Sequence, residues 1–194
     1  NKIFFDNSGF IKIENYLKSE KFEKISNEIN VEIENILLSN SEKLKNLGGY
    51  KMGNLNISLG AKGEALWEIM KVAGIENTIE EITGFKKNKY DIFFGGNLLF
   101  PYPFTYDQLF HTDGVRIPRK IIISIAIHDI EINNGPTQIY EGSHNENLPY
   151  WKFVKKYFFK KKYTVLLKKG DIFLRETFIW HRGTKNKINK KRIL

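Results

Sequence analysis

The sequence predicts a mainly β domain, either an antiparallel sandwich or a jelly roll, with helices flanking the sheets. Its 194 residues suffice for one domain with a long peripheral segment. A content of 41% hydrophobic and 14% aromatic residues supplies a full core. From Tyr90 onward, short β-rich runs separated by turn residues replace helical periodicity. We therefore expect one domain over 1–194, with a helical part over 1–89 packed on one sheet of a jelly-roll core over 90–194.

Two helices are expected in the first part. Residues 16–46 contain Ser19 as an N-cap, acids in the following turn, and apolar residues that recur near helical spacing until the glycine pair 48–49. Residues 61–82 show a second apolar face, and Gly84 is typical of the residue that ends a helix.

Eight runs in the second part have the β-branched and aromatic character of strands. The turns between them contain Gly, Asn and Pro, and Asn134-Gly135 is typical of a tight turn with a positive φ. Along one run, isoleucines alternate with Ser124 and other smaller residues, which predicts a bulky face beneath helices and a smaller face inside a barrel. The predicted strands are 90–100, 102–111, 120–130, 137–140, 163–167, 172–174, 178–181 and 190–194.

The formal charge of +9 is concentrated near the C-terminal end, where residues 150–194 contain 12 Lys and 3 Arg against Asp171 and Glu176. An anionic substrate or partner would explain this, and so would a compositional drift toward Lys. Residues 149–162 are predicted to form a short basic, aromatic helix that either covers the sheet with its rings or lies on a membrane surface or an acidic glycan. Because Lys far outnumbers Arg, nucleic acid is not the expected partner.

Several classes of protein are excluded by composition. There is no Cys, so disulfides, thiolate metal sites and cysteine nucleophiles are absent. No apolar run approaches the roughly 18 to 20 residues that cross a bilayer. The first residues also lack the pattern of a secretory signal, so a cytoplasmic location is expected.

The four histidines include a candidate metal site. In His111-Thr112-Asp113, an imidazole and a carboxylate lie two residues apart and would share one face at a strand end. His181, in a distant strand-like stretch, would complete a set of two His and one carboxylate, which holds Fe(II) and leaves positions open for oxygen and a chelating cosubstrate. By itself, the His-x-Asp pair fits an ordinary strand boundary as well.

Arg192 favours the iron interpretation. A strand through His181, a turn and a returning strand would bring the Arg192 guanidinium into the same barrel interior. A guanidinium binds a carboxylate through two hydrogen bonds, which suits the distal carboxylate of 2-oxoglutarate while its 2-oxo-acid end chelates iron. We therefore expect Fe(II), 2-oxoglutarate as cosubstrate and O2.

The order of these motifs resembles the phytanoyl-CoA dioxygenase (PhyH) family of Fe(II)/2-oxoglutarate-dependent oxygenases. The resemblance covers most of the chain, through the segments 7–17, 111–113, 133–136, 141–144 and 181–186 and through Arg192. It implies a double-stranded β-helix fold, a variety of jelly roll. It also implies His111, Asp113 and His181 as iron ligands and catalytic residues, Arg192 as the 2-oxoglutarate anchor, and Ser124 as a residue of the 2-oxoglutarate pocket.

The resemblance also bears on the reaction. Relatives that halogenate have a small residue in place of the carboxylate, so Asp113 implies hydroxylation, although desaturation, cyclisation or epimerisation would use the same ligands. His128 and His144 are expected to be structural, and Asn186 to shape the loop after His181. The substrate is expected to be a small metabolite, sugar or acyl compound. Residues that could line its site, with ordinary packing as the alternative for the aromatic ones, are Tyr102, Phe104, Tyr106, Arg116, Arg119, Trp180 and Arg182.

Two other functions fit parts of the sequence. A non-enzymatic jelly-roll module could bind a polyanion or nucleic acid through the basic C-terminal part. A zinc or manganese cupin would bind metal without turning over 2-oxoglutarate, but it would not need Arg192. The oligomeric state is left open.

Overall fold

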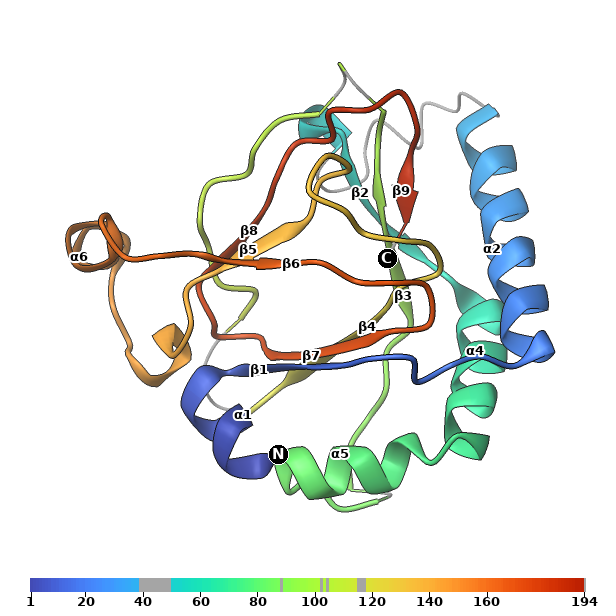
Figure 1. Cartoon of the computed structure of the whole chain (residues 1–194), viewed down its shortest axis with the longest axis horizontal. Coiled ribbons are helices and arrows are strands. Elements are labelled where there is room, and N and C mark those ends of the chain that lie inside the picture. Colours follow the sequence, from blue (N-terminus) through green and yellow to red (C-terminus); the bar gives the residue numbers. More distant parts are fainter. Residues whose placement is uncertain (39–49, 88, 102, 104, 115–117, 194) are drawn as a thin grey trace.

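The computed structural model describes residues 1–38, 50–87, 89–101, 103, 105–114 and 118–193, which form helices and antiparallel sheets (Figure 1). The α-helices are α1 (Lys2–Ser8), α2 (Glu20–Leu38), α4 (Gly60–Val72), α5 (Ile75–Thr83) and α6 (Tyr150–Tyr157), and the 3-10 helices are η1 (Tyr50–Met52) and η2 (Ser143–Asn145). The strands are β1 (Phe10–Ile13), β2 (Asn54–Ser58), β3 (Gly95–Leu99), β4 (Ile121–Ile125), β5 (Thr137–Ile139), β6 (Tyr163–Val165), β7 (Ile172–Glu176), β8 (His181–Gly183) and β9 (Arg192–Ile193).

The first long helix begins where the sequence places its cap. The hydroxyl of Ser19 accepts a hydrogen bond from the backbone N–H of Phe22 at 3.2 Å, and Glu20 and Glu23 lie in the first turn of α2. The helix therefore starts at Glu20 rather than at residue 16. The part of the prediction over 39–49 lies outside the described residues.

The second predicted helix, 61–82, is wrong as a single element. Gly74 has a φ of 86° and separates α4 from α5, because a left-handed residue cannot continue a right-handed helix. Gly84 ends α5 with a φ of 77°, as expected. Helix α1 and strand β2 were not predicted, since each is short and lacks a long periodic pattern.

Most predicted strands exist in shortened form, and two predictions are wrong. Among the described residues of 102–111, none belongs to a strand, and His111 forms only an isolated bridge. Residues 178–180 form a turn, so β8 begins at His181 instead of ending there.

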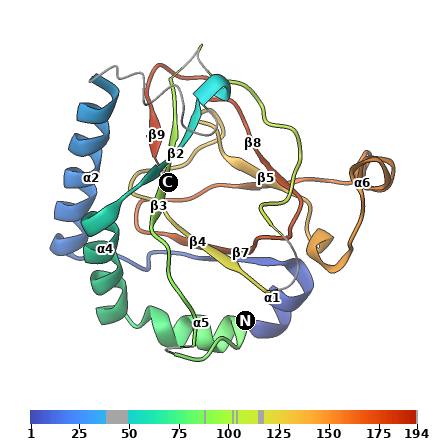
Figure 2. The same ribbon diagram turned by 180° about the vertical axis from the view of Figure 1, so that it is seen from behind.

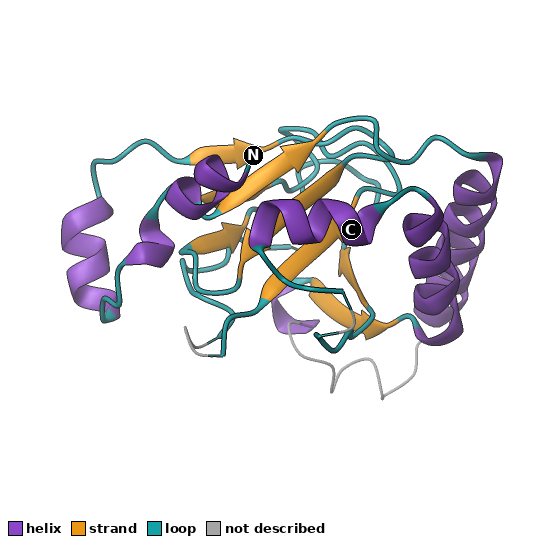
Figure 3. Cartoon of the chain, turned by 90° about the horizontal axis from the view of Figure 1, so that it is seen from below, coloured by secondary structure: helices purple, strands orange, loops and turns teal. Residues whose placement is uncertain are grey.

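The strands form three sheets in which every pairing is antiparallel. Their orders are β1-β7-β4, β2-β3-β9 and β6-β5-β8. Figures 1 and 2 both place β2, β3 and β9 on the side of α2 and α4, and β5, β6 and β8 on the side of α6. Seen from below, helices lie at both ends of the molecule, and another helix crosses in front of the strands (Figure 3).

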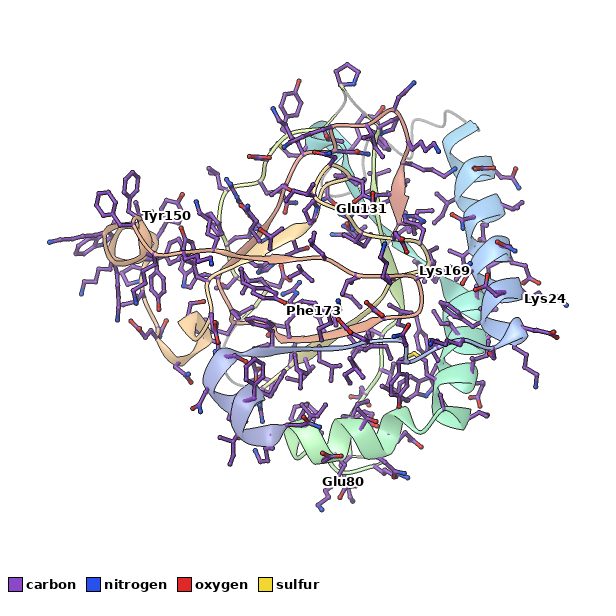
Figure 4. All side chains as sticks on the ribbon, viewed as in Figure 1. Lys24, Glu80, Glu131, Tyr150, Lys169 and Phe173 are labelled. Carbon is purple, nitrogen blue, oxygen red and sulfur yellow. The ribbon has the colours of Figure 1, made fainter. Side chains whose placement is uncertain are left out.

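Two apolar clusters cover opposite faces of the first sheet. In the outer one, Ile172 and Leu174 of β7 share a cluster with residues of α2, α4 and α5, such as Phe22, Leu66 and Ile79. In the inner one, Phe173 packs with residues of β5 and β6; Figure 4 shows Phe173 among the central strands. Successive residues of β7 therefore face helices and interior in turn, as strand geometry requires.

Helix α6 lies at the edge of the molecule, and it forms where a basic, aromatic helix was predicted. Its Phe153 and Tyr157 are buried in a third cluster with Tyr140 and Trp180, and the rings of Phe153 and Trp180 stack at 3.9 Å. Other aromatic side chains of this segment are exposed, among them Trp151 and Phe159. In the described part of the chain, no helix combines the length and apolar character needed to cross a membrane.

Candidate metal centre

Two histidines from distant parts of the sequence lie next to each other. The backbone N–H of His111 donates to the carbonyl of His181 at 2.9 Å, and the N–H of His181 donates to the carbonyl of His111 at 3.0 Å. Because this bridge joins a loop to the first residue of β8, it fixes the two imidazoles on one side, with ring centroids 4.5 Å apart.

Both imidazoles are oriented in the same way. Nδ1 of His111 donates to the carbonyl of Leu109 at 2.8 Å, and Nδ1 of His181 donates to the carbonyl of Ile179 at 2.9 Å. A hydrogen bond of this kind places the proton on Nδ1 and leaves the lone pair of Nε2 available to a metal ion.

Asp113 completes the set. Its Oδ1 lies 3.5 Å from Nε2 of His111, and its Oδ2 lies 3.3 Å from Nε2 of His181. One ligand atom from each of the three residues falls within 4.8 Å of the others. Adjacent ligands about 2.0–2.2 Å from one ion are roughly 3 Å apart, so the three side chains fit a single ion of the type held by two His and one carboxylate.

Arg175 of β7 is a charged residue of the site that sequence reasoning missed. Its Nη2 lies 2.5 Å from Oδ2 of Asp113, and its side chain is only 11% exposed. A signal was present in the sequence, because Arg175 lies two residues after Phe173 at the end of an apolar run and therefore shares its face of the strand.

The ionisation of the three candidate ligands reflects these contacts. Burial would raise the pKa of Asp113, but the close contacts with the imidazoles of His111 and His181 and the charge of Arg175 outweigh it and hold this pKa well below its usual value. The hydrogen bond to Asp113 raises the pKa of His111. Burial, followed by the charge of Arg175, lowers the pKa of His181. Asp113 is thus an anion at neutral pH, and the lowered pKa of His181 favours its neutral form.

A cavity of about 710 Å³ opens beside these side chains. Its polar wall consists of amides, of which Asn97 donates to Asn54 at 2.5 Å and to Asn56 at 3.0 Å. Gln108 lines it near His111 and accepts a hydrogen bond from the backbone N–H of Gly183 at 2.8 Å. The remaining wall is mostly Ile and Leu, so the cavity combines apolar surface with a few polar groups, as small-molecule sites do.

Arg192 of β9 also lines this cavity. It is 2% exposed, and its Nε has no hydrogen-bond partner among the residues that the structure describes. Burial lowers the pKa of Arg192 to about 10, so it still carries its charge. A buried guanidinium with an unsatisfied donor fits a bound carboxylate, and 2-oxoglutarate offers two.

His128 supports the position of Arg192 without belonging to the metal set. Its Nε2 accepts the backbone N–H of Ile193 at 2.7 Å. Burial, followed by the charges of Arg192, Lys169 and Lys191, lowers the pKa of His128 to about 4, so the ring is neutral and able to accept this hydrogen bond.

Ser124 lines the cavity as well, together with Ile122 of the same strand. In the antiparallel register, Ser124 is opposite Phe173 and Ile122 is opposite Arg175, so all four share the interior face. The structure thus gathers His111, Asp113, His181, Arg192 and Ser124 around one cavity.

Other expected residues lie elsewhere. Arg119 was expected near the substrate, but it does not line the cavity. It donates hydrogen bonds to Glu176 of β7 and to the carbonyl of Thr83 of α5 and thereby joins these two elements. Arg182 donates to Gln138 and covers the ring of Phe110, and Trp180 stacks under α6. Tyr106 is 59% exposed.

Three further candidates, Tyr102, Phe104 and Arg116, lie outside the described residues. His144 is not part of the metal set, since its Nε2 lies 3.1 Å from the carbonyl of Asp6. Asn186 shapes the loop after β8, where its side chain donates to the carbonyls of Phe100 and Lys190.

The sequence and structure were compared with known proteins. The family model described as Phytanoyl-CoA dioxygenase (PhyH) matches residues 5–194. No curated protein matches the sequence.

Several solved structures have similar folds at low sequence identity. The carbocyclase SnoK from nogalamycin biosynthesis, described as non-heme and alpha-ketoglutarate-dependent, has a TM-score of 0.69 at 14% identity, covering 99% of this chain and 79% of SnoK. The epimerase SnoN, in complex with Fe3+, alpha-ketoglutarate and nogalamycin RO, has a TM-score of 0.72 at 15% identity, covering 99% and 78%. HygX from Streptomyces hygroscopicus, with nickel, 2-oxoglutarate and hygromycin B bound, has a TM-score of 0.66 at 13% identity, covering 98% and 82%.

Proposed function

Since the chain belongs to the phytanoyl-CoA dioxygenase (PhyH) family and is an Fe(II)- and 2-oxoglutarate-dependent oxygenase, we propose that His111, Asp113 and His181 hold its iron. The observation that carries this proposal is the convergence of three ligand atoms within 4.8 Å of one another from two distant segments. The Nδ1 hydrogen bonds support it, because they direct each Nε2 toward the carboxylate.

For the cosubstrate, we propose that Arg192 binds the distal carboxylate of 2-oxoglutarate and that Ser124 lines the same pocket. Arg192 is buried with an unsatisfied Nε, which a carboxylate would satisfy. Arg192 lies in β9, and the backbone N–H of the next residue, Ile193, donates to His128 and so helps to hold this strand beside the cavity.

We also propose that the strands of the three antiparallel sheets form one double-stranded β-helix in a single domain. Residues 90–194 supply most of its strands, whereas the expected helical part over 1–89 adds strands β1 and β2 besides the helices on the outer face. The two clusters on opposite faces of β7 support this division into an outer and an inner layer. A cytoplasmic location likewise remains a prediction.

The reaction that we propose is hydroxylation of a small molecule, with release of succinate and CO2. Iron and 2-oxoglutarate supply the oxidising chemistry when they are bound. The chain contributes the orientation of three ligands, a guanidinium for the cosubstrate and an apolar cavity that limits access of water. Hygromycin B is bound to HygX and nogalamycin RO to SnoN, which supports a small-molecule substrate for this chain.

The alternative of a non-enzymatic polyanion-binding module loses its basis once the family is known, since it assigned no role to the metal set. The basic helix α6 has a structural role in covering Trp180 and Tyr140. The zinc or manganese cupin is disfavoured by the buried Arg192, which needs an anionic partner that these metals alone do not supply.

Succinate release from 2-oxoglutarate tests this function. Purified protein with Fe(II), ascorbate and air should produce succinate slowly without substrate and faster when a fraction of a metabolite pool contains the substrate. Asp113→Ala should abolish both rates, whereas Asp91→Ala, which removes an exposed carboxylate outside the cavity, should leave them unchanged. Succinate release by Asp113→Ala at the normal rate would refute the proposed site.

A further inference from the structure

The cavity is lined by few charged residues, and more of them are positive than negative. Within the described chain they are Asp113, Arg175 and Arg192. The other lining residues are amides, the two histidines of the metal set, a serine, a threonine, glycines, Phe173 and aliphatic side chains. Each histidine binds a metal ion in its neutral form. In the proposed function, on which the inference about these charges rests, iron and 2-oxoglutarate occupy the same cavity.

The bound cofactors do not balance these charges. Fe(II) brings two positive charges and 2-oxoglutarate two negative charges, so they cancel. The carboxylate of Asp113 then neutralises only one of the two guanidiniums. One positive charge is left on two largely buried arginine side chains, where an uncompensated charge is strongly unfavourable.

The excess charge can be located on Arg175. Arg192 is assigned to the cosubstrate, while Arg175 contacts Asp113 through Nη2 alone. Nη1 of Arg175 is buried and has no hydrogen-bond partner among the residues described. When the carboxylate of Asp113 binds iron, the positive charge of the metal offsets part of the attraction between Asp113 and Arg175. The guanidinium of Arg175 therefore needs a second anion.

We infer that the prime substrate is a small acid whose single anionic group, a carboxylate or a phosphate, binds Nη1 of Arg175. Arg175 touches a ligand of the iron, so the anchored substrate would lie beside the metal with its adjacent carbon within reach of the reaction. The amide wall of Asn54, Asn56 and Asn97 then faces the rest of the molecule and suits hydroxyl or amide groups on it.

Two other roles of Arg175 make different predictions. If Arg175 only positions Asp113, replacing it will weaken metal binding and affect acids and neutral compounds equally. If it binds 2-oxoglutarate, replacing it will weaken cosubstrate binding. Neither of these roles would make the protein prefer an acid over its neutral counterpart, whereas the role inferred above would.

The test is calorimetric binding to protein loaded with Ni(II) and 2-oxoglutarate, which cannot turn over. The probes are small carboxylic acids and phosphate monoesters, each paired with a neutral counterpart, such as butyrate with butyramide, benzoate with benzamide and phenyl phosphate with phenol. The proteins are the unaltered chain, Arg175→Gln, Arg175→Lys and Arg182→Gln. Arg182 is the matched control, since it lies outside the cavity lining and bonds to Gln138.

The unaltered protein and Arg182→Gln should bind the best acid about tenfold or more tightly than its neutral partner, the ratio expected for one charge-assisted hydrogen bond. Arg175→Gln should bring this ratio close to one, and Arg175→Lys should restore part of it. Comparing the carboxylic acids with the phosphate monoesters shows which of the two anionic groups Arg175 binds.

Equal binding of acids and neutral partners, binding of no acid in the set, or an unchanged preference in Arg175→Gln would overturn the inference. Nickel and 2-oxoglutarate affinities are measured in the same samples. If the unaltered protein binds neither nickel nor 2-oxoglutarate, the proposed function itself fails. If both affinities are normal and only the charge preference is missing, the role of Arg175 alone is refuted.

Discussion

The backbones of His111 and His181 exchange two hydrogen bonds, at 2.9 and 3.0 Å, across an isolated antiparallel bridge. The main chain therefore sets the separation of the two imidazoles, and side-chain freedom contributes little to it. Asp113 follows two residues later, and its backbone N–H donates to the carbonyl of Thr177 at 2.8 Å. A metal centre held in this way is preorganised, because few torsions remain to be fixed when the ion binds.

Arg192→Lys tests the assignment of the 2-oxoglutarate anchor. We expect the 2-oxoglutarate concentration for half-maximal succinate release to rise by about tenfold or more, because the charge survives while the paired hydrogen bonds are lost. Iron affinity should change little, since Arg192 does not contact the metal set. Lys190→Met, an exposed change two residues away, is the control. An unaltered 2-oxoglutarate requirement would remove Arg192 from the site.

His128 predicts a specific pH dependence of stability in the metal-free protein. Its pKa is about 4 in the folded chain, against 6.5 as the ordinary value, so between these values the unfolded chain binds more protons. The free energy of unfolding should therefore rise with pH from 4 to 6.5, by at most about 3 kcal/mol and by less where solvent screens the ring. Urea unfolding at pH 5 and pH 7 should show a smaller difference for His128→Gln. An equal difference would contradict the buried, neutral state of this ring.

Gly135→Ala should destabilise the fold at the turn between β4 and β5. Gly135 has a φ of 81°, and a Cβ there would lie 2.1 Å from Cδ2 of Leu99 and 2.8 Å from the carbonyl oxygen of Thr184. We expect a loss of about 2–4 kcal/mol in thermal or urea unfolding. Gly74→Ala is the matched control, because its φ is 86° and nothing lies within 4 Å, so it should lose only about 1–2 kcal/mol. Equal losses would show that the contact with Leu99 does not matter.

Phe153→Ala and Phe159→Ala form a pair that tests the role of α6. The side chain of Phe153 is 2% exposed and stacks on Trp180, whereas that of Phe159 is 94% exposed. Removing the buried ring should lower the free energy of unfolding by about 3–5 kcal/mol, and removing the exposed one by less than about 0.5 kcal/mol. A similar loss for both variants would mean that α6 stabilises the fold in another way.

The sequence predicted the candidate site better than it predicted the strands. The sequence order of two His, one Asp and one Arg suggested a metal site with an anion-binding residue. The four residues named on that basis, His111, Asp113, His181 and Arg192, all line one cavity. The segment before His111 was predicted as a strand because its alternating aromatic residues resemble one face of a sheet. Its described residues form no strand, and their one isolated bridge is at His111. Local periodicity cannot distinguish these cases.

Arg175 was missed for a related reason. Its role depends on a contact with Asp113 that joins residues far apart in sequence. Strand alternation puts Arg175 on the same face as Phe173, but the sequence alone does not show that this face points to the interior. The split of the predicted second helix at Gly74 is different in kind, because an isolated glycine inside a helical pattern is compatible with either outcome until its φ is known.

The most direct test of the account is the visible charge-transfer band that forms when Fe(II) and 2-oxoglutarate are added together without oxygen, because it appears only if the cosubstrate chelates the bound metal. The unaltered protein and His144→Gln, which removes an imidazole outside the metal set, should both show the band. His181→Ala should lose it, together with most of the iron affinity. A band of normal intensity at normal iron affinity in His181→Ala would contradict the assignment of His111, Asp113 and His181 as the iron site.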